Sequence, residues 1–323
     1  MRLLFINSGL KGIPEGYTRS IMDVLNNWPS LEVMEVWPQE LTINTIKSYY
    51  PDLIMVFHGN LTPLDIIQYA HTRGILTFIW IVEDPYELDV HTSEWLHSYD
   101  YVFTTEIEAL AYYNSHNVFY LPWGTNTEIY HPCSVPLKYR SDLCFVGMGF
   151  KNRAEILNAI AEEIKGLDVK LIGNWEKWGA ELKPCLQDYV LPVHSRAEEV
   201  ARFYAGARIN LNIHRDPVDD INVNTPGIGA ESLNNRTFDI AAAGGFQIVD
   251  DKRKELNKFY CPGKEIVVFR DPHDLANKIK YYLRDNTIRK EITANAFFKT
   301  VNYHTFKNRI TRMFNIIKRG YDL

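Results

Sequence analysis

The sequence predicts an α/β protein made of two Rossmann-like domains, each with a parallel sheet covered by helices. Short apolar runs alternate with helical patterns along all 323 residues, which is typical of parallel strands joined by crossover helices. The runs form two successive series, and a polar, proline-containing segment separates them. With 46% hydrophobic and 23% charged residues, the chain is long and apolar enough to form about two cores.

The predicted strands are short apolar runs bounded by polar or glycine-containing turns. The first series comprises residues 3–7, 31–37, 53–57, 76–82, 101–105 and 118–121. The second series comprises residues 143–147, 169–173, 189–191, 209–214, 246–250 and 266–269. We therefore expect one parallel sheet in each domain.

These series predict the domain organisation. We expect an N-terminal domain over residues 1–125, a linker over 126–141 and a C-terminal domain over 142–302. Residues 303–323 carry apolar side chains at spacings of three and four, which predicts a helix that packs back on the first domain. Ligands of parallel sheets bind beyond the carboxyl ends of the strands, so we expect the two domains to face each other across a ligand-binding cleft.

Composition argues against several classes of protein. A net charge of -5 argues against binding to nucleic acid over a broad basic face. The longest apolar run, residues 75–82, is well below the roughly 20 residues that a membrane-spanning helix needs. The four cysteines show neither a CxxC pair nor zinc-ligand spacing, which is typical of free thiols in a reducing compartment. We expect a cytoplasmic protein without a transmembrane segment.

One segment of the second series predicts an anion site. Asn234 is a good N-cap for a helix over residues 235–243, and Gly244 and Gly245 favour the end of that helix. The N-terminus of such a helix presents free N–H groups and the positive end of a dipole, which suits a diphosphate. Arg236 adds a positive charge there.

Other candidate binding residues follow predicted strands. Arg153 and Arg215 add cations near strand ends, although Arg153 could instead pair with Glu155 or Glu162 at the surface. Trp175 is a candidate neighbour of a nucleobase, with core packing as the alternative. The complete predicted donor-binding set is Gly147, Arg153, Asn174, Trp175, His214, Arg215, Glu231, Asn234, Asn235, Arg236 and Asp239.

The chain resembles glycosyltransferases of the GT-B fold over nearly its whole length, and more narrowly the family of the spore maturation protein CgeB. The most specific element is the Asn-x-Arg-x-Phe-Asp pattern that runs from Asn234 to Asp239. Further elements of the resemblance are Phe145-Val146-Gly147 with Asn152-Arg153, and residues 171–174, 209–215 and 302–309. The resemblance implies a sugar transferred from a nucleoside-diphosphate sugar, with UDP as the expected nucleotide and no separate cofactor. It also implies that the C-terminal domain binds the donor and the N-terminal domain binds the acceptor.

Glu231 and Asp239 resemble the spaced acidic pair of retaining members of this superfamily. The resemblance implies that Asp239 holds the ribose hydroxyls and that the Glu231 loop lies near the sugar. Asp239 stands where many relatives carry glutamate, which shortens its reach. The alternative is that Asp239 is only a surface residue near the start of the helix.

We expect a metal-independent reaction. Arg153, Arg215 and Arg236 can neutralise a leaving diphosphate by fixed charge and hydrogen bonds. No apolar-flanked Asp-x-Asp motif marks a divalent-metal site. The adjacent pairs at 219–220 and 250–251 are expected to be solvated turns.

An inverting transfer also needs a base that removes the proton of the acceptor. The predicted catalytic candidates are His58, Glu83 and Asp84, because each follows a strand of the first series. The alternatives are an ordinary turn at Asp84-Pro85 and a loop closure at His58.

Two other functions remain open at this point. One is a nucleotide-sugar epimerase of the same fold, and the other is a non-catalytic scaffold protein of a spore layer. For the expected transferase, the sequence leaves the acceptor open between a glycan, a protein and a small molecule. We expect a role in the synthesis of a spore-surface or cell-surface glycan.

Overall fold

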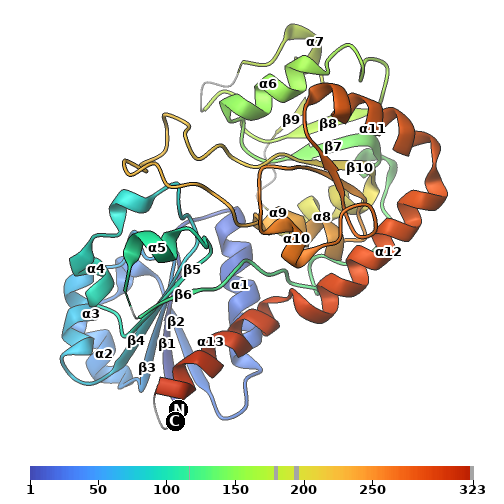
Figure 1. The fold of residues 1–323 in the computed structure, drawn as a ribbon. Helices are drawn as coiled ribbons and strands as arrows, with labels where there is room; N and C mark the ends of the chain where they lie inside the picture. The colour runs from blue at the N-terminus through green and yellow to red at the C-terminus, as the bar shows by residue number, and fades with distance from the viewer. Residues whose placement is uncertain (116, 178–180, 193–195, 321–323) are drawn as a thin grey trace. The chain divides into compact units, whose positions relative to one another are not determined.

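The computed structural model describes residues 1–115, 117–177, 181–192 and 196–320 (Figure 1). The chain divides into two compact units. The first unit consists of Met1–Trp123, Asn222–Glu231 and Phe306–Leu323, and the second of Gly124–Ile221 and Ser232–Thr305. The last three residues of the predicted C-terminal helix, 321–323, lie outside the described residues.

The first unit contains a six-stranded parallel sheet with the strand order β2-β1-β3-β4-β5-β6. Its strands are β1 (Arg2–Ile6), β2 (Glu32–Val36), β3 (Leu53–Phe57), β4 (Leu76–Ile81), β5 (Tyr101–Thr104) and β6 (Val118–Tyr120). Its helices are α1 (Ile13–Asn26), α2 (Ile43–Tyr49), α3 (Leu64–His71), α4 (Ser93–His97), α5 (Ala109–Tyr113) and α13 (Phe306–Gly320), with short 3-10 helices η1 (Pro38–Glu40) and η2 (Leu88–Val90).

The second unit contains another six-stranded parallel sheet, with the order β12-β11-β10-β7-β8-β9. Its strands are β7 (Ser141–Val146), β8 (Val169–Ile172), β9 (Val190–Leu191), β10 (Ala207–Asn212), β11 (Gln247–Asp250) and β12 (Val267–Phe269). Its helices are η3 (Leu137–Tyr139), α6 (Lys151–Ala159), α7 (Pro184–Gln187), α8 (Ala197–Gly206), α9 (Asn235–Ala242), α10 (Leu256–Phe259), α11 (Pro272–Arg284) and α12 (Asn286–Tyr303).

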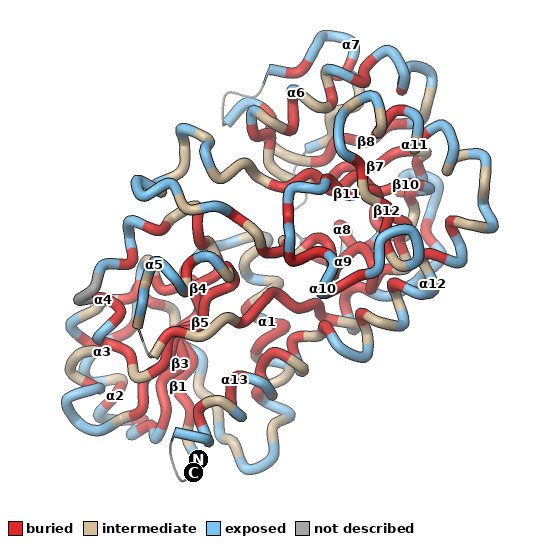
Figure 2. Tube along the Cα trace, in the orientation of Figure 1, coloured by how far each residue is buried: buried red, intermediate tan, exposed pale blue. Residues whose placement is uncertain are grey.

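Both sheets confirm the predicted fold class. Each predicted apolar run contains a strand, and most strand ends agree within one or two residues. The apolar runs find the strands because a strand that is covered on both faces needs apolar side chains at nearly every position. Strands β3 and β4 are buried along their full length, as the red central segments of Figure 2 show.

In each sheet the direction in which successive strands are added reverses once, and we call this place the reversal point. In the first sheet the chain builds outward from β1 to β2 and then returns to β3 on the other side of β1. In the second sheet it builds from β7 to β9 and returns to β10 on the other side of β7. The loops that follow the two central strands diverge at such a point, which makes it the usual ligand site of doubly wound sheets.

The segment predicted as a linker, residues 126–141, is part of the second unit. Ile129, Tyr130, Val135 and Tyr139 are buried in one apolar cluster with side chains of α8 and α9. The sequence prediction used the polar residues and prolines of this segment and missed its apolar face, through which the segment packs in the second core.

Helix α13 packs in the first unit. Phe306 lies 6.0 Å from Trp80 of β4, and Phe314 lies 4.9 Å from Trp28, which follows α1; both distances join ring centroids. The buried Arg309 donates Nε to the carbonyl oxygens of Pro122 (3.0 Å) and Trp123 (2.8 Å). Within the described residues, no helix is long and apolar enough to cross a membrane.

Arg309→Met should lower the thermal stability of the protein. The change removes a charged donor and leaves two buried carbonyl oxygens without it, which costs about 2 kcal/mol. We expect the unfolding midpoint in a thermal scan by circular dichroism to fall by about 4–8 °C. Arg312→Met, on the exposed face of the same helix, is the matched control, and equal midpoints for the two variants would contradict the assignment.

Candidate functional site

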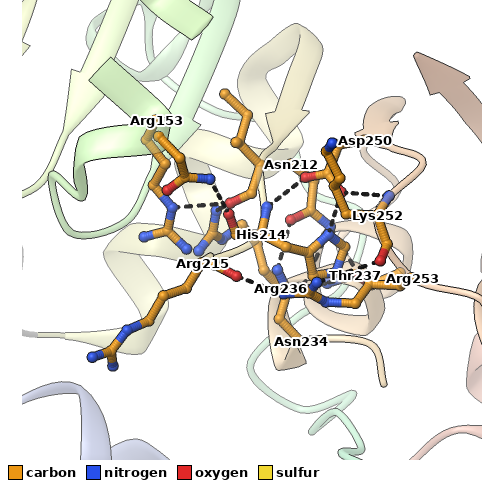
Figure 3. A network of polar contacts seen from close by, with 12 residues as sticks. Arg153, Asn212, His214, Arg215, Asn234, Arg236, Thr237, Asp250, Lys252 and Arg253 are labelled. Carbon is orange, nitrogen blue, oxygen red and sulfur yellow. Dashed lines mark hydrogen bonds and ion pairs between the residues drawn. The ribbon is translucent and has the colours of Figure 1, made fainter. Parts of the chain in front are cut away.

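The reversal point of the second sheet gathers most of the predicted donor-binding residues. Leu211 of β10 pairs with Phe145 of β7, so the two strands end side by side. Gly147 follows β7. His214 and Arg215 follow β10 (Figure 3). The site therefore lies where a doubly wound sheet is expected to hold a ligand.

Two glycines let the loops after β7 and β8 approach each other closely. A Cβ atom on Gly173 would collide with the carbonyl oxygen of Gly147. A Cβ atom on Gly147 would lie 2.9 Å from Nη2 of Arg236. Any larger residue at 147 would therefore displace this guanidinium.

Helix α9 begins at Asn234, as predicted, and polar side chains hold this start in place. The Oδ1 atom of Asn234 accepts a hydrogen bond from the Thr237 backbone N–H at 3.0 Å. The Asn212 side chain donates to Thr237 Oγ1 at 2.9 Å and accepts from Asn234 Nδ2 at 2.9 Å. The last residue of β10 therefore ties the helix start to the sheet (Figure 3).

Arg236 is a buried cation, and its guanidinium lies next to a main-chain carbonyl oxygen and an aromatic ring. Its side chain lies 5.0 Å from the centre of the Phe145 ring, and its Nη1 is 3.5 Å from the Ile213 carbonyl oxygen. Among the described residues, no carboxylate lies within ion-pair distance of Arg236. A carbonyl group carries no net charge, so the positive charge stays available to an anion.

Arg153 is buried, which excludes the surface ion pair considered for it. It donates Nε to the Ile213 carbonyl oxygen and Nη1 to the Met148 carbonyl oxygen, each at 2.9 Å. The Arg215 guanidinium lies over the Phe150 ring at 4.6 Å. Arg153, Arg215 and Arg236 thus lie around the end of β10 (Figure 3).

His214 forms a buried pair with Asp250 of β11. The backbone N–H of His214 donates to Oδ2 of Asp250 at 2.6 Å, and its Nδ1 lies 3.1 Å from Oδ1. Burial lowers the pKa of His214 to about 4, so the imidazole is neutral at pH 7. The neutral ring donates Nδ1–H to the carboxylate, and the pair fixes the direction of the chain after β10.

Asp250 and Arg253 belong to the site, and the sequence prediction missed them. Asp250 was expected in a solvated turn, but it is buried at the end of β11. Arg253 is also buried and donates Nη2 to the carbonyl oxygen of Arg215 at 2.6 Å. The position of Asp250 after an apolar run was a usable signal, whereas nothing local marks Arg253.

Asn174 and Trp175 serve the local fold. The side-chain oxygen of Asn174 accepts backbone N–H bonds from Glu176 (3.1 Å) and Lys177 (2.8 Å), which closes the turn after β8. Trp175 is buried in the apolar core, with its ring 5.5 Å from that of Phe145. The packing alternative thus describes Trp175 in this structure, and contact with a nucleobase stays a prediction.

Asp239 is buried, which excludes the surface alternative for this residue. Its Oδ1 accepts a bond from Thr125 Oγ1 at 2.7 Å, and its Oδ2 accepts one from Asn235 Nδ2 at 2.9 Å. Burial raises the pKa of Asp239 to about 7. The carboxyl therefore ties α9 to the segment after residue 123, and the ribose contact stays a prediction. Its proposed partner in the acidic pair, Glu231, belongs to the first unit.

Asp84 is the centre of a buried polar cluster in the first unit. It accepts hydrogen bonds from Thr104 Oγ1 (2.6 Å) and Tyr113 OH (2.9 Å), and His91 Nδ1 lies 3.1 Å from its Oδ1. Its oxygens are therefore already engaged, which suits an anchor better than a base. The sequence prediction missed His91 and Tyr113: His91 directly follows η2, and Tyr113 is the last residue of α5, 29 residues beyond Asp84.

His58 follows β3, next to the reversal point of the first sheet. Its backbone has a φ of 71°, a left-handed conformation that non-glycine residues rarely adopt and that often marks functional loops. Burial lowers the pKa of His58 to about 4. Glu83 is half-buried, and its carbonyl oxygen accepts a turn bond from the Tyr86 N–H at 2.7 Å. The catalytic roles of His58, Glu83 and Asp84 stay predictions.

Comparison with known proteins agrees with this architecture. Residues 153–315 match the sequence profile of a family described as glycosyl transferase-like. The chain is 27% identical over 313 residues to the spore protein CgeB of Bacillus subtilis strain 168, covering 95% of each chain.

Solved structures share the fold at low sequence identity. Sucrose-phosphate synthase from Thermosynechococcus elongatus superimposes with a TM-score of 0.68 at 12% identity, covering 100% of this chain and 99% of that one. Anabaena Alr3699/HepE in complex with UDP and glucose gives a TM-score of 0.68 at 11% identity, covering 99% of this chain and 100% of that one. Identities this low support the fold alone.

Asp239→Asn should change how stability depends on pH. The pKa of Asp239 is about 7 in the folded protein, above the roughly 3.9 of an unfolded chain. The stability that this group contributes is complete below about pH 4 and is lost as the pH rises to about 7. Asparagine removes that loss, so the unfolding free energy of the variant relative to the wild type should rise by about 2 kcal/mol from pH 5 to pH 8. Thermal scans across this range measure the difference, and a constant difference would contradict the assignment.

Proposed function

The chain belongs to the glycosyl transferase-like family, and from this premise we propose that it transfers a sugar from a nucleoside-diphosphate sugar, with UDP as the nucleotide. The proposal depends above all on one observation, the buried Arg236 guanidinium beside the start of α9. Its charge has no carboxylate partner among the described residues, and Gly147 gives it room. A diphosphate is an anion that suits a buried arginine beside a helix N-terminus.

The fixed charges of this site suit the chemistry of the leaving group. When the bond between sugar and phosphate breaks, negative charge develops on the diphosphate. Arg236, Arg153 and Arg215 surround the end of β10, and hydrogen bonds to the main chain hold the first two in place. Because these donors need no large rearrangement, they can stabilise the leaving group without a divalent ion.

A solved neighbour supports the choice of substrate class. Alr3699/HepE, which shares the fold, was crystallised with UDP and glucose. The similarity to spore protein CgeB supports a role in spores, and we propose that the product is a surface glycan of spores or cells. For the acceptor, we propose the carboxyl edge of the first sheet, where His58 and the Asp84 cluster follow β3 and β4.

Binding of UDP tests the proposal directly. Isothermal titration calorimetry of the full chain should detect UDP, and Arg236→Met should weaken binding by about 10- to 100-fold, because it removes a charge-assisted contact. Arg270→Met is the matched control, because this arginine is exposed and lies beyond β12. Equal affinity of wild type and Arg236→Met would remove the diphosphate assignment. Failure of UDP, GDP, TDP and CMP all to bind would overturn the proposed function.

Transfer should continue without divalent ions. We expect the hydrolytic release of UDP from UDP-glucose, in which water takes up the glucosyl group, to be unchanged by excess EDTA in a chromatographic assay, because arginines compensate the diphosphate. Loss of activity with EDTA and its recovery with magnesium would reject the metal-free mechanism. Conversion of UDP-glucose to another UDP-sugar without release of UDP would favour an epimerase.

A further inference from the structure

Residues 222–231, which we call the strap, belong to the first unit, although the residues before and after them in the sequence belong to the second unit. Along the chain, the strap comes after β10 and before α9, the two elements that meet at the proposed donor site. It contains neither helix nor strand (Figure 1). Its last residue is Glu231, the first member of the predicted acidic pair. A segment with this connectivity needs specific contacts to hold it in the first unit.

The first attachment of the strap is to the segment that follows β4. The backbone N–H of Val223 donates to the Tyr86 carbonyl oxygen at 2.9 Å, and the Asp89 N–H donates to the Val223 carbonyl oxygen at 3.0 Å. The Asp89 carboxylate then accepts from Thr225 at both its backbone N–H (3.0 Å) and its Oγ1 (2.7 Å). The Asp89 carboxylate thus holds Thr225 by both its backbone N–H and its hydroxyl group.

The second attachment is at the end of the strap. The backbone N–H of Glu231 donates to Oε1 of Glu106 at 3.1 Å, and Glu106 is buried after β5. The Glu106 N–H donates in turn to Thr104 Oγ1, which donates to Asp84. The place of Glu231 is therefore tied to the Asp84 cluster of the proposed acceptor site.

The strap closes on itself between these attachments. The Asn224 side chain donates to the Ile228 carbonyl oxygen at 3.0 Å and accepts from the Ile228 N–H at 3.2 Å. This turn lets the two ends of the strap move together instead of independently. Release of the first attachment is then expected to loosen the second.

We propose that Asp89 is a positioning residue: by its bonds to Thr225 it holds the whole strap in the first unit and so sets the place of Glu231 for transfer. This inference rests on the proposed function for its effect on turnover. It assigns a role to a residue outside the sites described above. The hydrogen bonds of Asp89 go to Val223 and Thr225 of the strap, so its effect on the two sites is indirect.

Hydrogen exchange measures the strap without any substrate. In Asp89→Asn we expect exchange at the Thr225 and Glu231 amides to rise by about five- to tenfold, because lost bonds raise the open population. A rise at Thr225 alone would show a local role and would overturn the positioning role. Thr225→Val should reproduce the effect, Thr225→Ser should retain protection, and Asp65→Asn is the matched control, because Asp65 is an exposed residue of α3.

Turnover provides a second readout. Asp89→Asn should lower kcat for the release of UDP from UDP-glucose by about tenfold while the Kd of UDP stays within about twofold. A looser strap with unchanged kcat would overturn the effect on Glu231. A wild-type protein that neither binds UDP nor releases it would instead reject the proposed function, and the exchange data would still decide whether Asp89 holds the strap.

Discussion

The end of β10 is the constraint on which the arginine-lined site of the second unit depends. Its next carbonyl, that of Ile213, accepts hydrogen bonds from Arg153 and lies within reach of Arg236, while the following residue, His214, is held by Asp250. These bonds come from α6, α9 and β11, so one short stretch of main chain aligns three elements. The carbonyl oxygen positions cations without neutralising them, which preserves their charge for a ligand.

The two sheets use this reversal geometry differently. The second unit surrounds its reversal point with arginines, whereas the first unit surrounds its carboxyl edge with histidine, tyrosine and carboxylate groups. The first set suits an anion and the second suits hydroxyl groups and proton transfer. The division of polar chemistry between the sheets is what a two-substrate transferase requires.

The fold was predictable from sequence because its cause is local. Buried parallel strands such as β3 and β4 need apolar residues at nearly every position, and the Asn234 cap has its own signature. The roles of individual polar residues were less predictable. Asp84 was a reasonable base beside its strand, but its partners His91, Thr104 and Tyr113 come from other elements, and no local pattern announces them. Asp250 and the strap were missed for the same reason, because both depend on contacts between distant segments.

The chain passes from one unit to the other four times, after Trp123, Ile221, Glu231 and Thr305. This feature constrains how such proteins can recombine. A chimera that joins the first half of one relative to the second half of another at residue 123 would combine a foreign strap and a foreign α13 with the first sheet. In such a chimera, Thr225 would come from one parent and its acceptor Asp89 from the other. Arg309 and the carbonyl groups of residues 122 and 123 would be divided in the same way. Exchange of the whole second unit between relatives therefore requires either four coordinated junctions or compatible strap and helix contacts, which favours diversification by substitution within one unit.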